Sequence, residues 1–110
     1  MLLCGCSEPP DKERQQAQGA VQAARAAGAE AYAPAELQDA EASLKKYDDA
    51  VAQRDYRQAL SAALEARDRA YAAVKQAGNR KAELRSQSDR LATDLDALII
   101  TASSRLSASA

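Results

Sequence analysis

The chain has 110 residues, of which 28% are charged and 46% are apolar, and its formal net charge at pH 7 is −1. It contains 28 alanines but no His, Trp or Phe, and Ala, Glu, Lys, Leu and Arg together make up more than half of it. This composition is typical of long helices and coiled coils, so we expect an all-α protein. The lack of His removes imidazole as a base or metal ligand, and the near-neutral charge argues against nucleic-acid binding.

Both cysteines lie within the first six residues. Cysteines separated by one residue cannot hold a fold together, and without further Cys or His they lack the ligands of a metal site. The segment Leu3-Cys4-Gly5-Cys6 instead resembles the bacterial lipobox. The resemblance implies that Cys6 receives a diacylglyceryl group, becomes the amino terminus after cleavage and is then acylated by a fatty acid such as palmitate. We therefore interpret residues 1–10 as a truncated lipoprotein signal with a polar tether.

Only Met1 and Leu2 precede this motif, whereas a signal sequence needs an apolar stretch of about 7–15 residues. Either translation starts further upstream, or Met1 is the genuine start and the motif is a chance match in a cytoplasmic protein. In the first case the resemblance implies a lipid-anchored protein on the periplasmic side of the cell envelope. Because Ser7 rather than Asp follows the lipidated cysteine, the outer membrane is favoured.

Three helices are predicted after the tether, and their residue ranges are about 11–29, 34–53 and 56–102. Pro34 suits the first position of the second helix, and Asp55 with Gln58 has the spacing of a capping box before the third. The short turn at Arg54-Asp55 requires the last two helices to be antiparallel. We therefore expect one helical domain at 11–102, an Ala-rich antiparallel hairpin extended to a three-helix bundle with a long C-terminal helix.

Each predicted helix carries an apolar stripe at spacings of three and four residues. The stripe of the first helix is almost entirely Ala. The stripe of the second helix is Leu37, Ala40, Leu44, Tyr47 and Val51. The stripe of the third helix is Tyr56, Leu60, Ala63, Leu64, Ala70, Tyr71, Val74 and Ala77. A heptad-like continuation follows at Leu84, Ser88, Leu91, Leu95, Leu98 and Ala102.

Gly78-Asn79 is the one ambiguous point in the third helix. It can end one helix and cap the next, or it can be a weak point costing about 1 kcal/mol in one continuous helix. Because no Pro lies beyond position 34, we favour a continuous helix that can bend at 78–79. The small, polar tail at 103–110 is expected to fray.

A family resemblance rests on two segments, Tyr32-Ala33-Pro34-Ala35-Glu36-Leu37 and Arg54-Asp55-Tyr56 followed by Ala59. With the Ala-rich sequence around them, over about 17–80, they resemble the bacterial envelope family called domain of unknown function 4398. The resemblance implies a short helical protein, often a lipoprotein, with no known activity and no catalytic residues. The family usually has Gly where this chain has Arg54.

The carboxylates and serines show no catalytic arrangement. Asp48 and Asp49 are adjacent and Asp94 and Asp96 are two residues apart, so the members of each pair point to different faces of a helix. No Ser can have a His partner, and the four glycines are scattered rather than grouped in a phosphate-binding loop. We expect no catalytic residue, no metal site and no cofactor, and hence no enzyme.

A basic cluster is the most prominent predicted surface feature, and its members are Arg67, Arg69, Lys75, Arg80, Lys81 and Arg85. One interpretation is a contact surface for anionic lipid or, noncovalently, for peptidoglycan. The other is an ordinary solvated helix face.

These observations favour a lipid-anchored envelope lipoprotein, attached to the membrane through Cys6, that acts as a non-enzymatic structural or protein-interaction module. The alternative is a soluble tetratricopeptide-like or coiled-coil adaptor that binds a peptide or helix partner. Self-association through the seam from Leu84 to Leu98 is a further expectation, because the chain has few large apolar residues for a core.

Overall fold

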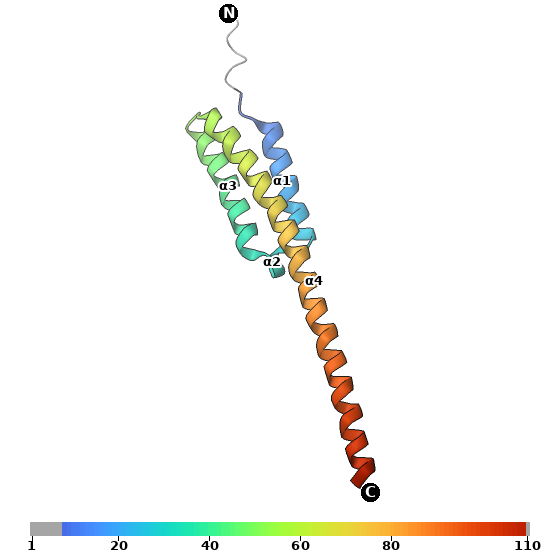
Figure 1. Cartoon of the computed structure of the whole chain (residues 1–110). Helices are drawn as coiled ribbons and strands as arrows, with labels where there is room; N and C mark the ends of the chain where they lie inside the picture. The colour runs from blue at the N-terminus through green and yellow to red at the C-terminus, as the bar shows by residue number, and fades with distance from the viewer. Residues whose placement is uncertain (1–7, 110) are drawn as a thin grey trace, which may run out of the picture. The chain divides into compact units, whose positions relative to one another are not determined.

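The computed structural model describes residues 8–109 of the chain (Figure 1). Within that range the protein is helical and has no strand, which confirms the predicted all-α class. The four helices are α1 (Asp11–Ala26), α2 (Ala29–Tyr32), α3 (Pro34–Ala52) and α4 (Tyr56–Ser109). The single turn of α2 was not predicted as a separate element.

The chain divides into two compact units, Met1–Asn79 and Arg80–Ala110. Helix α4 contributes residues to both units, because it continues without a break through Gly78-Asn79. The sequence had favoured this continuous helix, since no Pro lies beyond position 34. The sequence had indicated a single domain at 11–102. The tail at 103–110, predicted to fray, is instead helical as far as Ser109.

Two hydroxyl side chains near the end of α4 bond to the main chain of the helix. Thr101 and Ser109 each donate a hydrogen bond of 2.9 Å to the main-chain carbonyl four residues earlier. A hydroxyl inside a helix commonly donates to such a carbonyl. No Gly or Pro follows Gly78 in the sequence, so neither of these residues interrupts the helix. A small polar residue therefore does not end a helix in the way that the prediction assumed.

In the first unit α1, α3 and the N-terminal part of α4 lie side by side, each antiparallel to the one before (Figure 1). Pro34 begins α3, and the carboxylate of Asp55 accepts a 3.1 Å hydrogen bond from the Gln58 main-chain N–H at the start of α4. Both helix starts were predicted. The capping box is incomplete, because the main-chain N–H of Asp55 donates to the Ala50 carbonyl instead of to the Gln58 side chain.

Two turn residues of the first unit adopt left-handed backbone conformations. Gly28 has φ 89° and links α1 to α2, where its N–H donates to the Arg25 carbonyl. Arg54 has φ 58° between α3 and α4 and is the only non-glycine residue with positive φ in the described range. Glycine adopts this conformation readily at position 28, whereas the side chain of Arg54 makes it sterically costly.

The core of the first unit is built almost entirely from alanine. One buried cluster joins α1, α2, α3 and α4, and its members are Ala20, Val21, Ala24, Ala29, Ala33, Leu37, Ala40, Ala70, Ala73 and Ala77. A second joins α3 to the start of α4 through Tyr47, Ala50, Ala59, Ala62 and Ala63. Among described side chains that are less than 2% exposed, Ser43 is the largest.

The stripe predicted for the third helix was right at Ala63, Ala70 and Ala77 but wrong at two of its large members. Leu60 and Tyr71 are 39% and 57% exposed, while the face that is buried consists of Ala59, Ala62, Ala63, Ala66, Ala70, Ala73 and Ala77. The physical reason is distance, since a helix that presents only methyl groups can approach its neighbours more closely than one that presents leucines. The larger side chains are left at the edges of the contact.

The second unit has no buried side chain among its described residues, 80–109. Its large apolar side chains are all exposed, and they are Leu84, Leu91, Leu95, Leu98, Ile99, Ile100 and Leu106. This region therefore contains apolar surface that it does not bury itself.

Candidate functional site

The most connected polar group of the first unit surrounds Tyr47, at the interface of α1 and α3. The phenol is 3% exposed, and its hydroxyl donates a 3.3 Å hydrogen bond to Oδ1 of Asp11. The guanidinium of Arg14 lies 5.6 Å from the centre of the ring and donates through Nε to Oδ1 of Asp48 at 3.2 Å. These contacts join the first turns of α1 to the C-terminal half of α3 through residues that are 34 and 36 positions apart in sequence.

The chemistry of this group favours attachment rather than catalysis. Burial and the neighbouring carboxylate of Asp11 raise the pKa of Tyr47 above its ordinary value. The phenol is therefore neutral near pH 7 and acts as a hydrogen-bond donor, not as a nucleophile or base. Sequence reasoning had placed Tyr47 on the α3 stripe and had missed its partners, because nothing local relates Asp11 to a residue 36 positions later.

Two further polar links hold the helices of the first unit. Arg25 of α1 contacts Glu41 of α3 at 2.7 Å and Glu30 at 3.7 Å, and the hydrogen bond from Arg25 to Glu41 raises the pKa of the guanidinium. The buried Ser43 hydroxyl lies 3.1 Å from Oε2 of Glu65 on α4. Among described residues, no buried side-chain nitrogen or oxygen lacks a hydrogen-bond partner.

The six residues of the predicted basic cluster are divided between the two units. Arg67 pairs with Asp68 at 3.0 Å, and Arg69 pairs with Glu65 at 2.9 Å, so both charges are locally neutralised. Lys75 is exposed in the first unit. The other three members lie in the second unit and are also exposed, and they are Arg80, Lys81 and Arg85.

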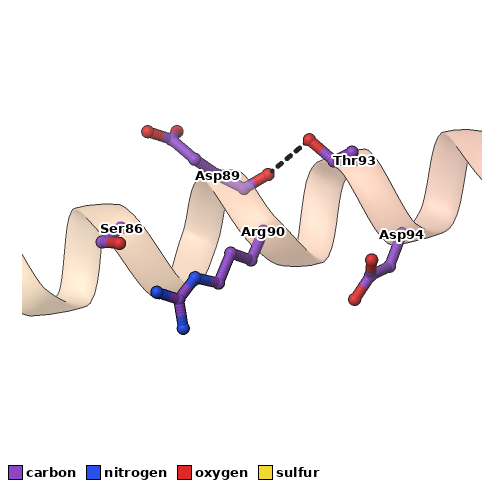
Figure 2. Close-up of a pocket in the computed structure, with 5 residues that line it drawn as sticks. All are labelled: Ser86, Asp89, Arg90, Thr93 and Asp94. Carbon is purple, nitrogen blue, oxygen red and sulfur yellow. Dashed lines mark hydrogen bonds between the residues drawn. The ribbon is translucent and has the colours of Figure 1, made fainter.

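Asp94 lines a shallow depression on the second unit together with Ser86, Asp89, Arg90 and Thr93 (Figure 2). All five belong to one exposed stretch of α4, so no second element closes over them. In Figure 2 the Asp89 carboxylate lies above the ribbon and the Arg90 guanidinium lies below it, and Thr93 donates to the main-chain carbonyl of Asp89 at 3.0 Å. An open surface of this kind does not exclude water from a carboxylate.

Residues 8–109 contain no group of three His, Cys, Asp or Glu side chains placed to hold a metal ion. A search of the same residues for a helix long and apolar enough to cross a membrane also found none. Cys6, the predicted lipidation site, lies outside the described residues.

A family model described as Domain of unknown function (DUF4398) matches residues 12–88. The chain belongs to this family. The predicted family resemblance is therefore confirmed, and the DUF4398 match covers the three-helix unit and the first residues of the second unit. Comparison with curated proteins gave no match, and neither did comparison with solved structures.

Arg54 lies at a turn whose backbone conformation favours glycine. The sequence resemblance placed a glycine at this turn in most members, and the backbone at Arg54 has φ 58°. Glycine adopts that conformation without steric cost. This chain forms the same turn with an arginine.

Proposed function

We propose that this DUF4398 chain is a lipid-anchored lipoprotein of the bacterial envelope, attached through Cys6. Its helical domain would then act on the periplasmic side as a non-enzymatic structural or protein-interaction module, with the outer membrane favoured. The observation that carries the proposal is the lipobox-like segment Leu3-Cys4-Gly5-Cys6, placed directly before the helical domain.

The spacing between Cys6 and α1 supports an anchoring role. α1 begins at Asp11, after Pro9 and Pro10, and the Asp11 N–H donates to the Pro9 carbonyl at 2.8 Å. Five residues span at most about 18 Å when fully extended. A lipid on Cys6 would therefore hold the first turn of α1 close to the membrane surface, and the proline pair prevents the helix from extending back toward it.

The polar contacts of the first unit are consistent with a structural role. Tyr47, Arg25 and Ser43 each use their polar atoms to join one helix to another. Contacts of this kind rigidify a bundle that would otherwise depend on small apolar side chains. An envelope protein or peptidoglycan would be the partner, contacted noncovalently through exposed charges such as Lys75 and Arg85.

A coiled-coil adaptor that binds a helix is the second candidate function. The exposed leucines of the second unit favour it, because a helix that leaves such residues uncovered presents a surface for another helix. This candidate does not require a lipid on Cys6.

Lipidation is tested by expressing the gene from its own locus with the upstream DNA and comparing Cys6→Ser with Cys4→Ser. We expect mass spectrometry of the membrane fraction to find an acylated Cys6 terminus in the wild type and in Cys4→Ser, since Ser at that position keeps a small residue in the motif. Cys6→Ser should lose the lipid and leave the membrane fraction. An unmodified Met1 terminus in the soluble fraction would overturn the proposal.

A further inference from the structure

The large apolar residues of the second unit follow a regular spacing on α4. Leu84, Ser88, Leu91, Leu95 and Leu98 are separated by four, three, four and three residues, and we refer to these five residues as the leucine seam. Its leucines are between 52% and 69% exposed. An average spacing of 3.5 residues is that of positions a and d in a coiled coil, which a helix keeps in line only when it supercoils around a partner.

The described part of the chain offers this seam no cover. Both buried clusters of the protein take their members from residues 20–77, and every described residue beyond 77 is exposed. The family match ends at Ser88, so most of the leucine seam lies outside the DUF4398 region. Within the described residues, no other part of the chain covers the seam.

Charges beside the seam favour a helix over a membrane surface as its occupant. A helix that lies on a membrane has a broad apolar face bordered by lysines and arginines. Here Ile99 is the one large apolar residue at the positions that flank the seam, Ser88 lies within the seam, and Asp94 is adjacent to Leu95. Carboxylates so close to the apolar residues oppose contact with anionic lipid but are normal beside a coiled-coil seam.

The distribution of charge along the seam identifies the occupant and its direction. Residues 80–90 carry more basic than acidic side chains, whereas residues 91–102 carry Asp94 and Asp96 and no basic side chain. A second copy in antiparallel orientation brings the basic stretch of each helix against the acidic stretch of the other. A parallel copy would place like charges together, including Lys81 beside its own equivalent.

We propose that the leucine seam pairs with the leucine seam of a second copy as an antiparallel two-stranded coiled coil. In this arrangement Leu84 of one copy is opposite Leu95 of the other, Ser88 is opposite Leu91, and Leu98 is opposite Lys81, whose aliphatic stem can pack against it. Arg85 then lies beside Ala92 of the second copy, within one helical turn of its Asp96. The proposal does not rest on the lipid at Cys6, and it goes beyond the function proposed above by naming the partner.

The seam is tested by measuring the mass of the full chain by sedimentation equilibrium across a concentration series, under reducing conditions. We expect a reversible change from monomer to dimer. Leu91→Asp should raise the dissociation constant at least tenfold. The matched control is Ile100→Asp, because Ile100 is 66% exposed against 69% for Leu91 but lies on the opposite face of α4, and it should change the constant less than twofold.

The direction of pairing is tested by charge reversal. Arg85→Asp and Asp96→Arg should each weaken the dimer severalfold, and the double variant should recover most of the loss. In a parallel pair these two positions are 11 residues apart, about 16 Å along the helix, so no recovery is expected there. Circular dichroism of each variant at low concentration checks that the helix content is unchanged.

Several outcomes would overturn the proposal. A constant monomer mass at all concentrations would exclude the dimer, and equal effects of Leu91→Asp and Ile100→Asp would exclude the seam. Failure of the double charge reversal to recover binding would exclude the antiparallel direction. A monomer that binds phosphatidylglycerol vesicles, and loses that binding in Leu91→Asp, would identify a lipid surface as the occupant instead.

Discussion

The two units of the chain treat apolar side chains in opposite ways. In the first unit the described side chains that are less than 2% exposed are those of alanines and Ser43, and Val21, Leu37 and Tyr47 are 3–4% exposed, while in the second unit leucines and isoleucines are more than half exposed. The hydrophobicity of a residue is therefore a poor guide to its burial in this protein. What decides burial is whether neighbouring helices lie close, and in the first unit it is the small side chains that allow them to.

The largest effect should come from enlarging a side chain in the alanine core. Ala70 is fully buried in the cluster that joins α4 to α1 and α3, and Ala70→Leu should lower the free energy of unfolding by about 2–3 kcal/mol because the added methyl groups separate the helices. Urea denaturation followed by circular dichroism measures this loss. The control is Ala72→Leu, two residues away and exposed, and a loss of equal size there would refute close packing as the cause.

Glycine has a conformational role at one point of the first unit and none at another. Gly28→Ala should lower the free energy of unfolding by about 1–2 kcal/mol, since φ 89° is costly for any residue with a Cβ. Gly19→Ala is the matched change inside α1, where a Cβ meets nothing within 4 Å, and it should stabilise the protein by about 0.5–1 kcal/mol. If both changes shift the thermal midpoint in the same direction, the assigned role of Gly28 is wrong.

The attachment of α1 to α3 should depend on pH through Tyr47. Tyr47→Phe removes the hydrogen bond to Asp11 and should cost about 1 kcal/mol near pH 7. Because folding raises the pKa of this phenol, its contribution is fully present below the ordinary tyrosine pKa and is lost as the pH rises through the raised value. Urea denaturation between pH 7 and about 11 should therefore show a steeper alkaline loss in the wild type than in Tyr47→Phe. Parallel curves would contradict this role.

Substitution of Arg54, in the turn between α3 and α4, should raise the free energy of unfolding. Arg54→Gly removes the steric cost of φ 58° but increases the freedom of the unfolded chain, so the net gain should be about 0.5–1 kcal/mol. A higher midpoint of urea denaturation is the expected readout. Arg54→Ala keeps a Cβ and should give little of that gain, whereas equal gains would point to the arginine charge rather than the backbone.

The smallest effect should come from deleting a large side chain in the second unit. Leu91 is 69% exposed, so Leu91→Ala in dilute monomeric protein should change the free energy of unfolding by less than about 0.5 kcal/mol. Thermal denaturation at the lowest practical concentration measures this change. A loss above 1 kcal/mol would mean that Leu91 is buried in the monomer and would remove the contrast between the two units.

The sequence predicted the helices better than their contacts. Pro34 and Asp55 mark the starts of α3 and α4 because their preferences are local, set by a fixed φ and by a side chain that reaches the next turn. The buried face of α4 was misjudged because the large residues Leu60 and Tyr71 dominate an apolar pattern, although alanines pack more closely. The end of α4 was misjudged because small polar residues do not by themselves end a helix when no Gly or Pro follows them.

The polar contacts between helices of the first unit could not be predicted from a local sequence pattern. Tyr47 with Asp11, and Ser43 with Glu65, are pairs 36 and 22 residues apart that meet only when the helices pack. The basic residues were found from the sequence, but Arg67 and Arg69 could not be known to pair with neighbouring carboxylates. Lipidation of Cys6 stays a prediction, carried by the motif around it.

The alanine core has a consequence for how this sequence can change over generations. A single base change converts an alanine codon into one for Val, Thr, Ser, Pro, Gly, Asp or Glu, and of these only Gly and Ser are close to alanine in size. Ser43 is a buried serine of this unit, and its hydroxyl has polar partners in the Asp39 carbonyl and Glu65. The first unit should therefore accept very few variants at its helix contacts, while the exposed helix of the second unit is free to vary until a partner restricts it.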